Sequence, residues 1–186
     1  FVYGWIDIYE NKGNRSGAYS TCVYGHHPYV LLYYLGSLDN VFTLAHEMGH
    51  SLHSCYTNRH QTYINSNYNI FVAEIASTCN EYILISHLLK KAETREEKAY
   101  LLNHLMDQFK GTLFRQTMFA EFEKITHEKE AKGEPLTCDT LCRIYSDLNK
   151  TYFGPDMIID EEISMEWARI PHFYTPFYVY QYATGL

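Results

Sequence analysis

Hydrophobic positions along the chain follow two spacings, and each spacing predicts a class of element. β-branched and aromatic residues dominate residues 1–9 and 29–35, which predicts a strand in each stretch. Gly36-Ser37 then breaks the pattern, and apolar residues recur at helical spacing from Val41 to Leu52. Ser37 or Asp39 can cap a helix that begins here. We therefore expect the strand over 29–35 to lead into an amphipathic helix of about four turns.

The rest of the chain predicts helices joined by polar loops. A polar loop is expected over residues 10–20, and an Asn- and Tyr-rich connection over 58–69, where Asn67 or Asn69 can cap the next helix. The helix expected over residues 93–132 is either continuous or divided at Gly111. The balance predicts a mainly α fold with a small β element, as one domain over residues 1–186. The expected helices cover residues 70–91, 93–132, 137–152 and 165–170.

Composition narrows the class of protein further. The net charge is −7 and no basic stripe appears, which argues against nucleic acid as a partner. The chain has no run of 18 apolar residues, so no transmembrane helix is predicted. The five cysteines form no C-x-x-C pair, although Cys138 and Cys142 lie one helical turn apart and could hold a metal. Ordinary thiols in a reducing compartment, and hence a cytoplasmic location, are the preferred interpretation.

The expected helix over 41–52 contains His46-Glu47-Met48-Gly49-His50, an H-E-x-x-H motif. On a helix the two imidazoles lie one turn apart on the same face, where both can bind one Zn²⁺. The glutamate between them can reach water on that metal and act as a general base. The motif predicts hydrolysis of a peptide bond, whereas a surface helix with two solvated histidines is the simpler alternative.

A tetrahedral zinc site needs a third protein ligand. His53 lies near the same helical face, but about 10 Å of helix axis separates it from His46, which is too far for bonds of about 2.1 Å. Glu74 is a better candidate, because it is a carboxylate on the apolar face near the start of the next helix. A salt bridge or a partner for the helix dipole would also explain Glu74.

The segment 171–182 concentrates histidine and tyrosine. Donors of these types near the metal would stabilise the oxyanion that peptide hydrolysis creates. Aromatic core and surface packing explain the same composition equally well. A different metal centre is also conceivable, because Glu47-x-x-His50 is an E-x-x-H of the di-iron type. The chain contains no second E-x-x-H, and metal analysis would distinguish one zinc from two irons.

Taken together, ordered blocks of the chain resemble the oligoendopeptidase F family of zinc peptidases, relatives of thimet oligopeptidase. The blocks are G-W-I-D-I-Y-E-N-K at 4–12, R-S-G-A-Y-S at 15–20, H-E-M-G-H-S-L-H at 46–53, A-E-I-A-S-T at 73–78, I-P-H-F-Y at 170–174 and F-Y-V-Y-Q-Y at 177–182.

The resemblance implies a zincin-like catalytic domain that hydrolyses short oligopeptides in a deep channel. It implies one Zn²⁺ held by His46, His50 and Glu74, with Glu47 as the base. It also implies that His172, Tyr174 and Tyr180 contact substrate or oxyanion, and that His53 serves as a supporting or substrate group. The strand over 29–35 would be the edge that pairs with substrate backbone.

Finally, the resemblance implies a fragment of a longer protein, without the N-terminal helical part that closes the channel. The strand-like start and aromatic-rich end of the chain fit that expectation. A fragment of this kind could also be a zinc-bound module that holds peptide, or serves a structural role, without cutting. The intact Glu47 argues against a defective site in the parent protein.

Overall fold

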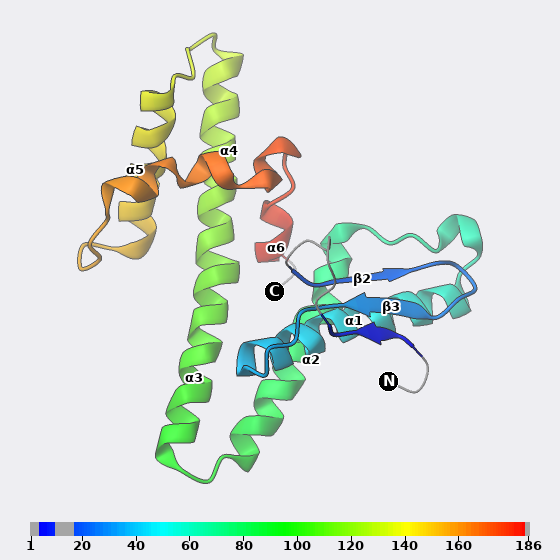
Figure 1. The fold of residues 1–186 in the computed structure, drawn as a ribbon. Coiled ribbons are helices and arrows are strands. Elements are labelled where there is room, and N and C mark those ends of the chain that lie inside the picture. The colour runs from blue at the N-terminus through cyan, green and yellow to red at the C-terminus, as the bar shows by residue number, and fades with distance from the viewer. Residues whose placement is uncertain (1–3, 10–16, 185–186) are drawn as a thin grey trace. The chain divides into compact units, whose positions relative to one another are not determined.

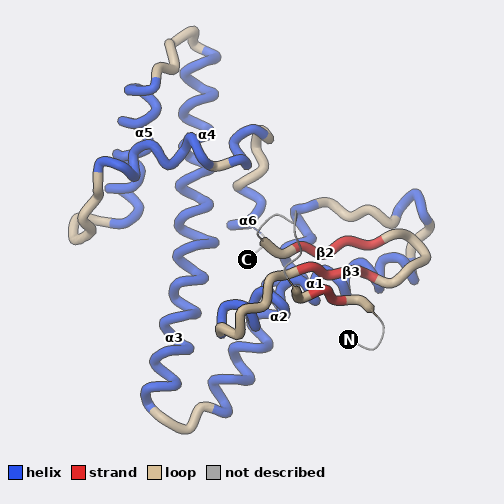
Figure 2. Tube along the Cα trace, in the orientation of Figure 1, coloured by secondary structure: helices blue, strands red, loops and turns tan. Residues whose placement is uncertain are grey.

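The computed structural model describes residues 4–9 and 17–184, which fall into two compact units. The first unit extends to Asn103, and the second runs from His104 to Thr184. Figure 1 shows the helices that make up most of each unit, and Figure 2 shows that the described strands belong to the first unit alone. The predicted fold class, mainly α with a small β element, is confirmed.

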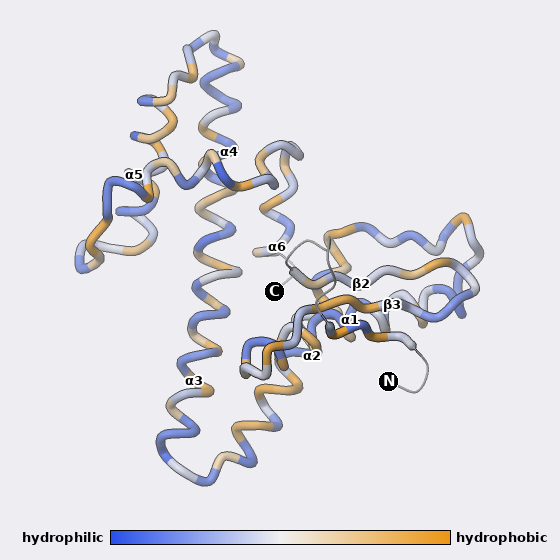
Figure 3. The backbone as a smooth tube through the Cα atoms, in the orientation of Figure 1, coloured by the Kyte–Doolittle hydropathy of each residue, from blue (hydrophilic) through white to orange (hydrophobic). Residues whose placement is uncertain are grey.

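Three short strands form the sheet of the first unit: β1 (Ile6–Asp7), β2 (Tyr19–Cys22) and β3 (Pro28–Leu31). β3 is central, with β1 parallel on one side and β2 antiparallel on the other. In register, Val30 pairs with Ile6 on one side and with Ser20 on the other. Figure 3 shows the hydrophobic stretch along β3, which fits a strand that is paired on both sides.

The structure corrects the predicted strands in three places. β3 ends at Leu31 rather than residue 35, although the backbone N–H of Leu32 still donates to the Asp7 carbonyl at 3.0 Å. The strand predicted over 1–9 reduces to Ile6–Asp7, and residues 1–3 lie outside the described residues. A loop was expected up to Ser20, which is wrong because pairing with β3 makes residues 19–22 a strand. Residues 10–16 of that loop also lie outside the described residues, with parts of two family blocks.

Two long helices complete the first unit: α1 (Leu38–His60) and α2 (Ile70–Lys91), with a 3₁₀ turn at Tyr63–Asn65 between them. α1 packs against α2 and against strands β2 and β3. It extends over 23 residues, longer than the four turns predicted. α2 has the predicted bounds. Its N-cap is Asn69, one of the two residues expected there, although the Asn69 side chain makes no capping hydrogen bond.

The second unit begins inside α3 (Arg95–Phe109), which continues through a π-helical segment (Lys110–Phe114) into α4 (Arg115–Ala131). Gly111 therefore marks a π-helical segment in a continuous helical run. α5 (Cys138–Phe153) begins after the capping residue Thr137. The 3₁₀ segments Glu161–Arg169 and Pro171–Tyr174 and the short α6 (Tyr180–Thr184) follow. A cluster of large apolar side chains forms the core: Met118, Phe119, Phe122, Tyr145, Leu148, Ile170 and Val179.

Within the described ranges, no helix combines the length and the hydropathy needed to cross a membrane.

Candidate metal centre

The H-E-x-x-H motif lies near the middle of α1, on a helix whose start is well defined. Ser37 accepts a hydrogen bond from the Asn40 backbone N–H at 3.2 Å, and the Asn40 side chain accepts one from the Ser37 N–H at 3.4 Å. This reciprocal capping box satisfies two backbone donors that the first turn leaves unpaired. Helical geometry then places His46 and His50 on one face, with Glu47 rotated toward the sheet.

Three side chains from two helices converge at this face of α1. The Nε2 atoms of His46 and His50 are 3.2 Å apart. Glu74 approaches from α2, and its Oε2 lies 3.2 Å from His46 Nε2 and 3.6 Å from His50 Nε2. One donor atom of each residue falls within 4.8 Å of the other two. The structure therefore brings together the three residues that sequence reasoning selected as ligands.

The chemistry of this donor set fits a zinc ion. Two imidazole nitrogens and one carboxylate oxygen form a set typical of catalytic zinc sites, which leave a further position open for water or substrate. The three ligand atoms lie close to one another. Glu74 is only 7% exposed, so a small cation bound here would compensate the charge of a buried carboxylate. Ser77 Oγ donates to Glu74 Oε2 at 3.0 Å and fixes the direction of the carboxylate.

Burial and neighbouring charges together shift the pKa of each member of the cluster. Burial acts to lower the pKa of His46, but hydrogen bonds and charges from Glu74 and Glu81 more than offset it and raise that pKa to about 10. Burial lowers the pKa of His50. Burial acts to raise the pKa of Glu74, yet the neighbouring imidazoles and Ser77 bring it below its usual value. Glu74 is thus a charged carboxylate beside two imidazoles, as a cation site requires.

Glu47 differs from Glu74 in its environment. Its side chain is buried beside strand β2, where it accepts a hydrogen bond from the Ser20 backbone N–H. Burial raises the pKa of Glu47 above the usual glutamate value. A carboxylate with a raised pKa is better suited to take up and return a proton near neutral pH.

The family model of peptidase family M3 matches residues 1–186. The chain belongs to peptidase family M3. It is 57% identical over 181 residues to the oligopeptidase PepF of Bacillus subtilis, and 53% identical to a chromosomal oligoendopeptidase F of Lactococcus lactis. These alignments cover 97% of this chain but only 27% and 30% of the two relatives. The M3 chain therefore spans less than a third of the length of these proteins.

Solved structures agree with the assignment to M3. The oligoendopeptidase-F of Enterococcus faecium superposes with a TM-score of 0.66 at 51% identity, over 80% of this chain and 26% of that one. The crystal structure of a protein from Chlamydophila abortus described as a peptidase superposes with a TM-score of 0.80 at 49% identity, over 98% of this chain and 31% of that one. The resemblance to oligoendopeptidase F that the sequence motifs indicated is confirmed.

His53 of the M3 chain does not join the ligand atoms. Its ring stacks on Tyr68, with centroids 3.9 Å apart and planes 12° from parallel, and burial lowers its pKa. The Tyr68 hydroxyl in turn lies 2.7 Å from Ser54 Oγ. His53 thus packs against Tyr68 and lies outside the convergent set of His46, His50 and Glu74.

Three further site residues predicted for the M3 chain belong to the second unit. His172 stacks on Tyr178 with ring centroids 5.5 Å apart. Tyr174 is 82% exposed, and Tyr180, the first residue of α6, is 47% exposed. All three side chains are accessible within their unit, and their contact with substrate stays a prediction.

The prediction that the strand over 29–35 is the substrate-pairing edge is wrong for the described sheet. β3 is the central strand, so its backbone groups already pair with β1 and β2. β2 is an outer strand of the three, and it also contacts α1 and hydrogen-bonds Glu47 through Ser20. The backbone edge beside the metal centre therefore belongs to β2.

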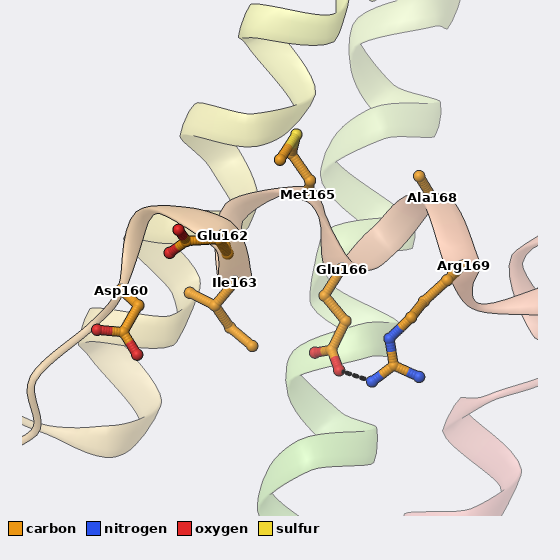
Figure 4. Close-up of a pocket in the computed structure, with 7 residues that line it drawn as sticks. All are labelled: Asp160, Glu162, Ile163, Met165, Glu166, Ala168 and Arg169. Carbon is orange, nitrogen blue, oxygen red and sulfur yellow. Dashed lines mark hydrogen bonds and ion pairs between the residues drawn. The ribbon is translucent and has the colours of Figure 1, made fainter.

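A shallow pocket in the second unit has a different character. Figure 4 shows its lining residues along the segment 160–169, with Arg169 aimed at the Glu166 carboxylate. Glu166 also accepts hydrogen bonds from Arg115 at 2.5 Å and from the Tyr145 hydroxyl at 2.6 Å. Two cations and a phenol satisfy this carboxylate, which makes it part of the packing of the unit.

Sequence reasoning missed the carboxylate of Glu81, which lies 2.5 Å from His46 Nδ1. Glu81 follows Glu74 by seven residues, close to two helical turns, and so shares its face of α2. That spacing was a usable signal. The spacing identifies Glu81 as a neighbour of His46 only when α2 is known to pack against α1.

Proposed function

We propose that this chain carries the catalytic centre of a zinc-dependent endopeptidase that hydrolyses short oligopeptides. The observation that supports it best is the convergence of His46, His50 and Glu74, with Glu47 buried beside them on α1. Family M3 membership and relatives named oligopeptidase or oligoendopeptidase point to the same activity. The proposed domain is the whole of residues 1–186.

In the proposed mechanism His46, His50 and Glu74 hold one Zn²⁺. When bound, zinc lowers the pKa of coordinated water towards about 7 and polarises the substrate carbonyl. The carboxylate of Glu47 takes a proton from the attacking water and later delivers it to the nitrogen of the leaving amine. The raised pKa of Glu47 favours both transfers near neutral pH.

Substrate contacts are assigned by family resemblance and by position in the sheet. Tyr180 and His172 donate hydrogen bonds to the oxyanion, and Tyr174 contacts the peptide. The outer edge of β2 pairs with substrate backbone, because it pairs with no other strand among the described residues and a free strand edge offers alternating donors and acceptors. The proposed partners are an oligopeptide substrate and the remainder of a longer protein that closes the channel.

The proposed location is the cytoplasm, which is consistent with five cysteines that are all free in the structure.

A second candidate function follows from the length of the relatives. Because the chain spans only 27% and 30% of two of them, the 186 residues could hold zinc and peptide without cutting. Positioning substrate contributes a large part of catalysis, and part of a channel positions substrate poorly.

Zinc content and cleavage of a quenched fluorescent peptide, measured together, test both candidates. The assay compares the 186-residue chain with the natural protein that contains it, with and without a zinc chelator. We expect one zinc per chain, chelator-sensitive cleavage by the longer protein, and retention of zinc but near-complete loss of turnover in Glu47→Gln. Glu96→Gln, an exposed carboxylate on α3, is the matched control.

Near-normal cleavage by Glu47→Gln would overturn the assignment of the base. Two irons in place of one zinc would overturn the assignment of the metal. Zinc binding without cleavage by the longer protein would favour the binding module.

A further inference from the structure

The His46 ring is contacted at both of its nitrogens. Nε2 points to the ligand cluster, 3.2 Å from Glu74 Oε2 and 3.2 Å from His50 Nε2. Nδ1, on the other side of the ring, lies 2.5 Å from Glu81 Oε1. The Glu81 side chain is 16% exposed, so water competes little for this carboxylate.

A second contact beside Glu81 holds the same parts of the two helices together. Asn80 Nδ2 donates to the Ala45 carbonyl at 2.5 Å, so consecutive residues of α2 bind consecutive residues of α1. The Glu81 carboxylate lies beside this contact, against the edge of the His46 ring. Its position results from the packing of α1 against α2.

The two histidines of the motif are supported by different acceptors. His50 donates a hydrogen bond to the backbone carbonyl of Ala73, a neutral acceptor. His46 donates to a carboxylate, and a hydrogen bond to a charged acceptor is stronger than one to a neutral group. An imidazole that donates from Nδ1 to a carboxylate keeps its Nε2 lone pair free, and the negative charge makes that nitrogen a better metal ligand.

We propose that Glu81 is a positioning residue of the metal centre. It holds His46 in the tautomer with the proton on Nδ1, orients Nε2 toward Glu74 and His50, and strengthens the zinc bond of His46. The inference rests on the zinc site proposed above. A purely structural role, as a link between α1 and α2, is the competing explanation.

The test measures zinc affinity by competition with a chromogenic chelator, in purified wild-type protein and variants. Glu81→Gln keeps the shape and the ability to accept a hydrogen bond but removes the charge. Compared as pH-independent constants, corrected for the proton that His46 releases, the zinc affinities should show a loss of about 10-fold to 100-fold, which is typical when such a supporting partner is replaced.

Two controls separate positioning from helix packing. Asn80→Ala removes the adjacent contact between the helices and leaves Glu81 in place, so we expect a loss of thermal stability and a change in zinc affinity of less than about threefold. Glu96→Gln removes an exposed charge from α3 and is expected to change neither quantity. Equal losses of zinc affinity in Glu81→Gln and Asn80→Ala would support the structural explanation and overturn ours.

A measurement on the wild type needs no variant and so does not depend on the folding of Glu81→Gln. Nitrogen NMR of ¹⁵N-histidine-labelled, zinc-loaded protein distinguishes a protonated Nδ1 from a metal-bound Nε2. We expect His46 to show a protonated Nδ1 and zinc at Nε2. Zinc at Nδ1 of His46 would overturn the role of Glu81. A wild-type protein that binds no zinc would instead refute the proposed metal site.

Discussion

Gly49 lies so close to Ser77 that a Cβ atom at position 49 would come 2.6 Å from the Ser77 Cα. The same atom would meet the Ala76 carbonyl oxygen at 2.7 Å. These contacts are with backbone, which cannot rotate away as a side chain could. The second variable position of the H-E-x-x-H motif is therefore constrained by packing: a hydrogen atom there lets α2 approach and brings Glu74 to the histidines.

Gly49→Ala is expected to push α1 and α2 apart. Overpacking of this kind costs about 1–3 kcal/mol of stability. Since Glu74 moves with α2, zinc affinity should also fall. Thermal unfolding of the metal-free protein and chelator competition measure the two effects. Gly111→Ala is the control, because a Cβ at that position has open space around it, and it should change stability by less than about 1 kcal/mol.

Glu74→Gln should abolish tight zinc binding. The variant keeps the size of the side chain and the approach of the helices, but it replaces a charged ligand by a neutral amide. We expect stoichiometric zinc in the wild type and in Glu96→Gln, and little zinc in Glu74→Gln after dialysis against a mild chelator. Retention of one zinc per chain by Glu74→Gln would remove Glu74 from the ligand set.

Zinc binding should depend steeply on pH. Metal-free His46 keeps its proton up to about pH 10, because Glu74 and Glu81 outweigh the effect of burial on its pKa. Zinc binds only neutral imidazole, so below that pH each binding event releases the His46 proton. Apparent affinity should rise roughly tenfold per pH unit between about pH 7 and pH 9.

Chelator competition at several pH values checks this dependence. Glu81→Gln provides an internal comparison, because with one carboxylate fewer the pKa of His46 falls and the affinity should level off at a lower pH. An affinity that is flat above pH 7 in the wild type would contradict the raised pKa.

Tyr180→Phe tests the predicted oxyanion contact in the longer protein proposed above. Loss of one oxyanion donor lowers kcat by roughly 10²–10³-fold, and binding of the ground state changes little. We therefore expect lower kcat, similar KM and unchanged zinc content. Tyr100→Phe, an exposed tyrosine on α3, serves as the control. A fall confined to KM would assign Tyr180 to substrate binding, and unaltered kinetics would remove it from the site.

Glu166→Gln should destabilise the second unit. The buried Glu166 carboxylate binds Arg115 and the Tyr145 hydroxyl, and removing one partner of such a buried network costs about 3 kcal/mol. Urea unfolding measures the loss, with Glu162→Gln on the same segment as the exposed control. Equal stability of the two variants would show that the Glu166 network is energetically neutral.

The contribution of Glu166 should also depend on pH. Burial acts to raise the pKa of Glu166, but Tyr145 and Arg115 bring it below the usual glutamate value. Stability from a lowered carboxylate pKa is present above the unfolded pKa, near 4.5, and disappears as the pH falls through the folded pKa. The difference between wild type and Glu166→Gln should therefore shrink in acid.

The sequence by itself determined what local patterns encode. Helical periodicity and capping residues predicted the bounds of α2, the start of α5 at Thr137, and a cap of α1 at Ser37 or Asp39, of which the structure uses Ser37. The spacing of His46 and His50 fixed their common face, because four residues make about one helical turn. Motif order indicated the M3 family.

Only the tertiary structure decided which distant segments meet. Residues 19–22 form the strand β2 because their backbone pairs with β3, which is the central strand. The composition of one strand does not encode which strand it pairs with. Glu81 stands 35 residues from His46, and their contact depends on the approach of α2 at Gly49. Packing of side chains and backbone between helices has no local period in the sequence, so the surroundings of the metal ligands emerge only when the chain is folded.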